Sequence, residues 1–162
     1  MNQRTSILLV GFFALGLFDA AMAGPFEDGD AAVKKGDYAT ALRILRPLAD
    51  HGNAAAQYEI AGMYSNGQGV RQDYTRAAAW YREAADQGNA GAQFKLGEMY
   101  ADAKGVPQDY VFAHMWFNLA AARTEIPLVR LFLAKKRDEV AAKMTPYQIA
   151  EAQRLAREWE PK

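Results

Sequence analysis

The stretch Gly67-Gln-Gly-Val-Arg-Gln-Asp-Tyr74, GQGVRQDY, looks at first like a glycine-rich phosphate loop in front of a helix. The same phrase returns 36 positions later as Ala103-Lys-Gly-Val-Pro-Gln-Asp-Tyr110, AKGVPQDY, with one glycine replaced by alanine. A phosphate loop carries Lys-Ser or Lys-Thr directly after its glycines, and neither copy does. The stretch is therefore better explained as the connection inside a structural repeat.

Residues 52–87 and 88–123 are two copies of one unit. When the two are aligned, 16 of 36 positions are identical, among them Trp80 with Trp116. A partial copy lies before them, in residues 24–51, where Gly36-Asp-Tyr38 precedes Ala41. A period of this length is typical of supersecondary units that stack on one another.

Each unit is predicted to form two helices. The first carries apolar residues at positions 56, 60, 63 and 64, which is the spacing of one helical face. The segment Asn66–Gly69 ends it, because glycine adopts the left-handed conformation that closes a helix at little cost. Asp73 is the predicted N-cap of the second helix, whose apolar face includes Ala77 and Trp80.

These residues resemble the Sel1-like repeat, a relative of the tetratricopeptide repeat with a longer connecting loop. The resemblance covers about residues 36–123 and is carried by Ala56-Gln-Tyr-Glu-Ile-Ala-Gly-Met-Tyr64, Asn66-Gly-Gln-Gly-Val70, Asp73-Tyr74, Ala77-Ala-Ala-Trp-Tyr81, Ala84-Ala85 and Gly88-Asn89, and again by Ala92, Leu96-Gly97, Tyr100, Gly105-Val106, Asp109-Tyr110, Ala113 and Trp116-Phe117. The second full copy departs from it at Ala103, His114 and Met115.

The resemblance implies an all-α fold, an α-α superhelical solenoid of helix hairpins, whose concave face mostly binds other proteins. Some cysteine-rich relatives are described as binding or hydrolysing β-lactams. This chain has no cysteine at all, so their pattern of one disulfide per repeat is missing. We therefore expect a non-catalytic protein-protein interaction module, with a cell-envelope hydrolase of β-lactam or peptidoglycan type as the alternative.

Residues 1–23 have the layout of a secretory signal peptide. Arg4 is followed by an apolar run from Ile7 to Phe18, which is too short to span a membrane, and then by Ala21-Met-Ala23. Cleavage between Ala23 and Gly24 would release the mature chain to the periplasm of a double-membraned bacterium. The alternative is an uncleaved N-terminal anchor.

The composition excludes several classes of partner. The chain carries no net charge, so no overall field favours nucleic acid or an anionic membrane. No second apolar run of transmembrane length follows the signal, so we expect no membrane insertion after cleavage. The stability of an exported chain without cysteines must come from packing. The partner is expected to be another protein or a peptide.

The two ends of the chain are predicted to close the stack. A short helix over residues 26–35 precedes a helix over Tyr38–Asp50. Residues 124–162 form a capping helix pair, the first opening at Pro127 and the second at Thr145-Pro-Tyr-Gln148, a capping-box layout. The run Leu128-Val-Arg-Leu-Phe-Leu133 has two interpretations: burial between the last repeat and the final helix, or a surface for self-association through Leu128, Leu131 and Phe132.

The inventory of reactive side chains is short. After residue 23 the only serine is Ser65, beside a predicted helix end where capping is its simplest role, and the only histidines are His51 and His114. An activated serine would be the minimal requirement of the hydrolase alternative. The histidines are far apart in sequence and lack nearby carboxylates at ligand spacing, so no catalytic residue, metal site or cofactor is predicted.

The partner-binding candidates lie opposite the apolar stripe of each unit's first helix. They are Tyr58 and Glu59 in one copy, beside Gly62, and Phe94, Lys95 and Glu98 in the next. Adjacent aromatic and charged side chains along a groove suit a peptide or a helix. The same positions also fit ordinary surface or packing between repeats.

Overall fold

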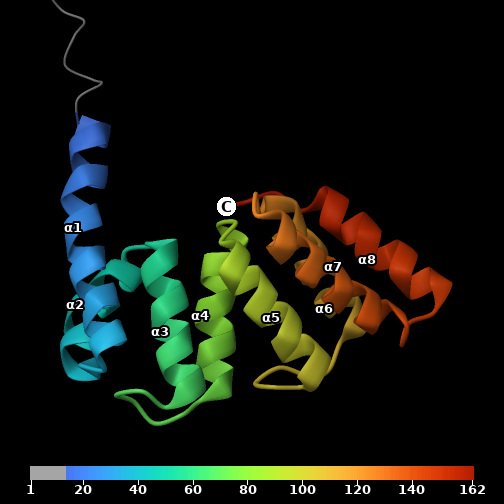
Figure 1. The fold of residues 1–162 in the computed structure, drawn as a ribbon, viewed down its shortest axis with the longest axis horizontal. Coiled ribbons are helices and arrows are strands. Elements are labelled where there is room, and N and C mark those ends of the chain that lie inside the picture. Colours follow the sequence, from blue (N-terminus) through green and yellow to red (C-terminus); the bar gives the residue numbers. More distant parts are fainter. Residues whose placement is uncertain (1–13) are drawn as a thin grey trace, which may run out of the picture.

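A computed structural model describes the backbone of residues 14–162 and the side chains of residues 24–162. This part of the chain forms eight α-helices and no strand, and α1 to α7 pack side by side in chain order (Figure 1). The helices are α1 (Ala14–Lys35), α2 (Tyr38–Asp50), α3 (Ala54–Asn66), α4 (Tyr74–Asp86), α5 (Ala90–Asp102), α6 (Tyr110–Arg123), α7 (Pro127–Ala141) and α8 (Pro146–Glu158). The predicted all-α solenoid is confirmed.

The predicted signal peptide is not open to a structural test. Residues 1–13 lie outside the described part, and residues 14–23 are described only as the helical start of α1. The prediction of a short first helix from residue 26 is wrong, because α1 continues upstream through Pro25 to Ala14. None of the helices described combines the length and the apolar content that a membrane crossing requires.

Polar caps begin each predicted helix of the repeats. The carboxylate of Asp73 accepts a hydrogen bond from the backbone N–H of Arg76 at 3.0 Å, and Asp109 accepts one from that of Phe112 at the same distance. Asn53 and Asn89 cap α3 and α5 in the same way. Each cap satisfies a backbone donor that the first helical turn leaves free, so the boundaries are set locally.

The two glycines of the loop have different roles. Gly67 is the left-handed C-cap of α3, with a φ of 69°, as predicted. Gly69 also has a positive φ, and a Cβ added there would lie 2.6 Å from the Cβ of Tyr38 at the start of α2. In the next copy, a Cβ at Gly105 would lie 2.1 Å from the carbonyl oxygen of Tyr74 at the start of α4. The loop of each hairpin therefore rests on the previous hairpin, and glycine permits the contact.

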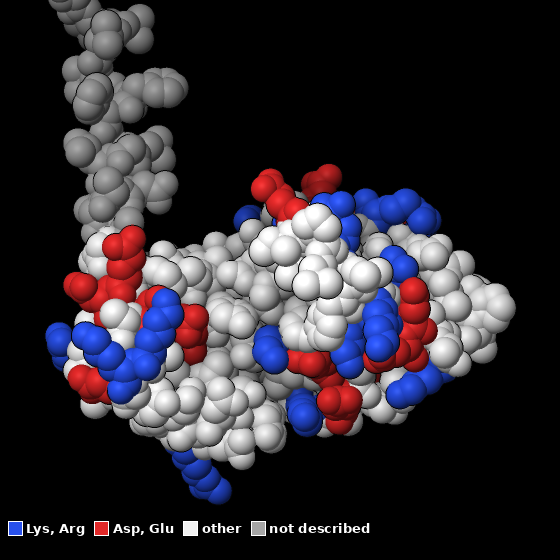
Figure 2. All heavy atoms as spheres, in the orientation of Figure 1, with Lys and Arg blue, Asp and Glu red and all other residues white. Residues whose placement is uncertain are grey.

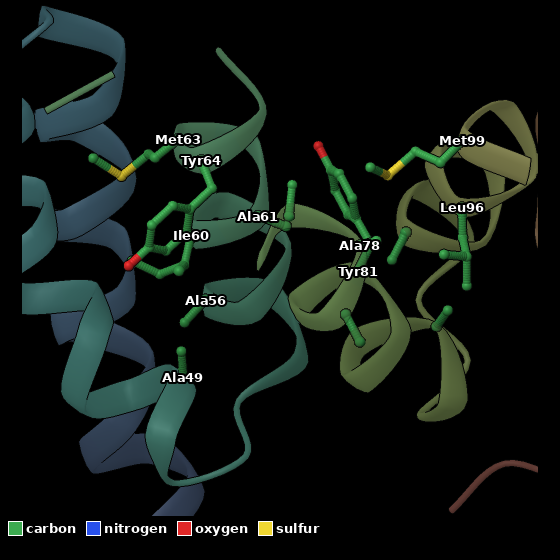
Figure 3. Packing of buried hydrophobic residues seen from close by; sticks show 14 of the residues in the cluster. Ala49, Ala56, Ile60, Ala61, Met63, Tyr64, Ala78, Tyr81, Leu96 and Met99 are labelled. Carbon is green, nitrogen blue, oxygen red and sulfur yellow. The ribbon is translucent and has the colours of Figure 1, made fainter. Parts of the chain in front are cut away.

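Small and large side chains alternate between neighbouring helices. Ala49 and Ala56 face one another where α2 approaches α3, while Ile60 and Tyr64 fill the wider space beside them (Figure 3). Ala56 and Ile60 are fully buried. Because neither helix of a hairpin covers its apolar face alone, stacking on the next hairpin supplies most of the stability.

An Arg–Tyr–Trp cluster repeats with the same 36-residue period. The guanidinium of Arg46 lies 5.2 Å from the ring centre of Trp80, and that of Arg82 lies 5.3 Å from the ring centre of Trp116. Arg82 also donates a hydrogen bond to the hydroxyl of Tyr100. The two tryptophans thus occupy equivalent places on successive hairpins.

The C-terminal helices cap the stack without forming a hairpin. Helix α7 begins at Pro127 as predicted, and at the start of α8 Thr145 and Gln148 make the predicted reciprocal bonds of a capping box. However, α7 and α8 each pack on α6 and scarcely touch each other. The chain then turns back, and Lys162 binds Asp86 at the end of α4 through its backbone and its ammonium group.

The apolar run 128–133 is not embedded between the last repeat and the final helix. Only Leu133 of this run is buried, whereas Leu128 and Leu131 are 76% and 68% exposed. The interpretation as a buried helix is wrong, because α8 lies on α6 and leaves the outer side of α7 open.

Candidate partner-binding surface

The first helices of the hairpins lie next to one another and form one continuous surface. On α3, Tyr58 reaches α5, where a Cβ added to Gly91 would lie 3.0 Å from its ring. On α5, the ring of Phe94 lies 5.7 Å from that of Phe132 on α7. All five predicted binding residues lie on this surface, which we call the odd-helix surface.

The middle of the odd-helix surface combines aromatic rings with an ion pair. Tyr58 is half-buried, with its ring centre 5.6 Å from that of Tyr81 on α4. Lys95 and Glu98 form a salt bridge of 3.0 Å on α5. A hollow of about 460 Å³ lies here, lined by Ser65, Asn66, Gln72, Tyr74, Tyr81, Lys95, Glu98, Met99, Asp102 and Lys104. The structure therefore brings Tyr58, Lys95 and Glu98 together.

Phe94 lies further along, towards α7. Its ring is half-buried between Phe117, at 5.8 Å between ring centres, and Phe132. The ammonium group of Lys95 lies 5.3 Å from its ring centre. Phe94 thus packs the last repeat against the capping helix.

Glu59 lies at the opposite end, towards α1. It is half-buried, and its nearest charged groups are Asp30 and Lys34, which pair with each other at 2.5 Å. Burial, reinforced by the charge of Asp30, raises the pKa of the Glu59 carboxyl, and Lys34 partly opposes this. The predicted residues therefore follow a strip from α1 to α7 and do not gather in one pocket.

Burial also changes the acidity of the tyrosines in the middle of the strip. It raises the pKa of the Tyr58 hydroxyl, an effect that Lys95 opposes and that Glu59 and Glu98 reinforce. Burial raises the pKa of Tyr81 as well. Both hydroxyls are neutral at physiological pH and are suited to donating a hydrogen bond to a bound chain.

Sequence reasoning missed residues that the surface takes from other elements. Tyr81 on α4 is buried, but its side chain lines the hollow. Lys136 and Glu139 on α7 line a smaller hollow of about 120 Å³ together with Glu98. No signal at the 36-residue spacing points to them, because the repeat ends at residue 123.

The reactive side chains do not assemble into a catalytic arrangement in the described part of the chain. Ser65 lines the hollow, but neither histidine is among the residues around it. His51 lies at the C-cap of α2, with Nδ1 at 2.6 Å from the carbonyl oxygen of Pro47, while His114 is buried on α6. The predicted capping role of Ser65 belongs to Gly67; Ser65 contributes its backbone carbonyl, which accepts from Gln72. The hydrolase alternative gains no support from this arrangement.

Two solved structures are similar to this chain. One is a protective antigen present in uropathogenic Escherichia coli strains with an SLR fold, at 30% identity and a TM-score of 0.78, covering 85% of this chain. The chain spans 29% of the length of that protein. The other is a Sel1 repeat protein from Oxalobacter formigenes, at 31% identity and a TM-score of 0.61, covering 75% of this chain and 93% of that one. The comparison with curated proteins gave no match.

The family pattern of the Sel1 repeat matches three consecutive segments, residues 20–53, 54–89 and 90–124. The second and third segments hold the helix pairs α3 with α4 and α5 with α6, and the first holds α2 with the second half of α1. Such repeats are protein-protein interaction scaffolds. Because the matched segments cover more than half of the sequence, this chain belongs to the Sel1 repeat family.

Proposed function

We propose that this chain is an exported, non-catalytic adaptor that binds a segment of another protein along its odd-helix surface, in the cell envelope. The bound segment is extended or helical and crosses the first helices between α1 and α7. It carries an apolar side chain for the hollow beside Tyr81 and charged groups for the ion pairs around it. The observation that carries this proposal is the hollow between α3 and α5, with its buried aromatic wall and its half-exposed ion pair.

The exposure of the ion pair favours a binding role over a structural one. The side chains of Lys95 and Glu98 are 41% and 36% exposed, so their salt bridge contributes little to folding. A charged group of a partner can replace either member at small cost to the fold. Such pairs mainly determine which partner binds and how fast it does so.

The test is affinity capture with a matched pair of charge-swap variants. Lys95→Glu/Glu98→Lys reverses an ion pair with a spacing of three residues on the odd-helix surface. Glu151→Arg/Arg154→Glu reverses a pair of the same spacing on α8, away from this surface. We expect the first variant to lose the proteins that the parent captures from an envelope extract, and the second to retain them. If both variants capture the same proteins as the parent, the odd-helix surface is not the binding site.

The export step rests on the sequence of residues 1–23 and has its own test. If the apolar run Ile7–Phe18 is a signal, the protein recovered from the envelope fraction begins at Gly24. Mass spectrometry of the intact protein measures this directly. A protein that keeps residue 1 and stays in the cytoplasmic fraction contradicts export but leaves the binding surface unaffected.

A further inference from the structure

The first half of α7 presents an apolar surface that the rest of the described chain leaves open. Leu128 is 76% exposed, Leu131 68%, Ile126 60% and Phe132 47%. In Figure 2 an uncharged region lies over this half of the helix, next to the Lys and Arg side chains of its second half. Soluble proteins seldom leave so many neighbouring apolar side chains in water unless another surface covers them.

The place of α7 in the stack explains which contact is missing. Helix α3 packs between α2 and α4, and α5 packs between α4 and α6. Helix α7 takes the next such position and packs mainly on α6, with Phe132 also touching Phe94 of α5, but α8 lies on α6 and not on the far side of α7. The side of α7 on which a second helix would lie is therefore vacant, and the open residues share the helical spacing of such a contact face.

The charges at the two ends of the open face are opposite in sign, so two copies of the face can be complementary to each other. Glu125 precedes the apolar residues and Lys135 follows them, each five positions from Arg130. Lys135 lies about 7.5 Å from Arg130 along the axis of α7, and Glu125 lies just before the N-cap Ile126, outside the helix. Both are exposed, and Lys135 lies on the same side of the helix as Leu128 and Leu131. In an antiparallel pair of α7 helices centred near Arg130, Glu125 of each copy meets Lys135 of the other. A two-fold interface requires this kind of reciprocity.

The helix start gives a second sign that the face is covered. Ile126 is the N-cap of α7 and makes no side-chain capping bond, although the other repeat and cap helices from α2 onward begin with Asp, Asn or Thr caps that do. Isoleucine is among the poorest N-cap residues. An exposed isoleucine at this position lowers the stability of the isolated helix, and it would stabilise an interface that buried its side chain.

We propose that two copies of this chain associate through an antiparallel, two-fold pairing of their α7 helices, with Ile126, Leu128, Leu131 and Phe132 at its centre and Glu125–Lys135 ion pairs at its rim. A standard interface buries about 800 Å² per partner. Four apolar side chains are too few to supply this area, so the polar residues around them must also be part of the interface. This interface adjoins the α7 end of the odd-helix surface, where Phe132 contacts Phe94.

The first test measures mass in solution. Sedimentation equilibrium of the purified protein, from low to hundreds of micromolar, is expected to show a reversible dimer. Leu131→Glu should weaken it about tenfold or more, because it removes a leucine that the dimer would bury and puts an unpaired charge in its place. Tyr147→Glu, which adds the same charge at an 80% exposed aromatic on α8, should leave the dimer intact. A parent protein that is monomeric throughout this range overturns the proposal.

The second test distinguishes the proposed geometry from any other dimer. Glu125→Lys and Lys135→Glu alone should each weaken the dimer, because each places like charges opposite one another. The double variant should restore it, since the pairs then meet with signs exchanged. Ile126→Ser should weaken the dimer while raising the melting temperature of the monomer, because serine caps α7. If both single variants weaken the dimer and the double variant does not restore its affinity, the antiparallel pairing is refuted.

Discussion

The second and third repeats, residues 52–87 and 88–123, share a backbone plan but have different neighbours. The positions that keep their identity include the N-caps Asp73 and Asp109, which begin their own helices, and the loop glycines Gly69 and Gly105, which rest on the previous hairpin. Several positions that differ lie where the third repeat meets the capping helices. Phe94, which replaces Tyr58, contacts α7, and Arg123, which replaces Gln87, lies over Trp159 after α8.

The replacement of Gln87 by Arg123 in the third repeat removes a half-buried hydrogen bond. In the second repeat, Gln57 donates to the carbonyl oxygen of Ala49 and accepts from Gln87. In the third, Gln93 makes the equivalent bond to Ala85, but its side-chain oxygen is buried without a partner. Arg123 instead stacks at 4.3 Å on the ring of Trp159. The repeat thus gives up an internal hydrogen bond for a contact that holds the cap.

The largest effect should come from the loop glycines. Gly105→Ala should lower the free energy of unfolding by about 3 kcal/mol or more, because the new Cβ meets the Tyr74 backbone at a positive φ. Gly69→Ala should cost about 2 kcal/mol, since its neighbour is a side-chain atom of Tyr38. Urea denaturation of both variants measures the difference. Equal, small losses would contradict the close approach of the loops.

The next effect concerns the repeated Arg–Trp contact. Trp116 is 1% exposed and lies against Trp159 at 6.3 Å between ring centres, whereas Trp80 is only half-buried. Because desolvation strengthens a cation–π contact, Arg82→Ala should cost about 2 kcal/mol and Arg46→Ala only about 0.5–1 kcal/mol. Chemical denaturation gives both values. A larger loss for Arg46→Ala would contradict this ranking.

A smaller effect should appear in the dependence of stability on pH. His114 is 3% exposed on α6, where the second repeat has Ala78, and burial, aided by Arg137 on α7, lowers the pKa of its imidazole, with Asp138 partly opposing. The unfolded chain therefore binds a proton at His114 more readily than the folded chain does. The free energy of unfolding is thus not reduced by this group above about pH 6.5, and it falls as the pH drops below that value.

His114→Gln should flatten the stability curve between about pH 7.5 and 5.5, because it removes the group that the unfolded chain protonates first. Melting temperatures of the parent and the variant at matched pH values measure the slope. An unchanged slope in the variant would show that another group causes it.

The smallest effect should come from exchanging the C-caps. Ala103 closes α5 with a φ of 55° and is the only residue other than glycine with a positive φ in the described part of the chain. Ala103→Gly should raise the free energy of unfolding by about 0.5–1 kcal/mol, and Gly67→Ala should lower it by a similar amount. Thermal denaturation of the pair provides the comparison; a loss in both would indicate that the caps are not equivalent.

The odd-helix surface shows how far the candidate site was predictable. The positions of Tyr58, Glu59, Phe94, Lys95 and Glu98 on one surface follow from helical spacing and the repeat. The surroundings of these residues do not follow from the sequence, because Tyr81, Asp30 and Phe132 come from other helices at sequence separations that no local pattern encodes. The binding role of these residues stays a prediction.

The sequence by itself determined the repeated hairpins, the caps at Asp73 and Thr145, and the family, because caps and helical faces depend on residues within one or two turns. Only the tertiary structure decided that α8 packs on α6 and that the run 128–133 stays open. An apolar stripe records that a helix needs a neighbour, but the choice of neighbour depends on how all the helices share the available surface.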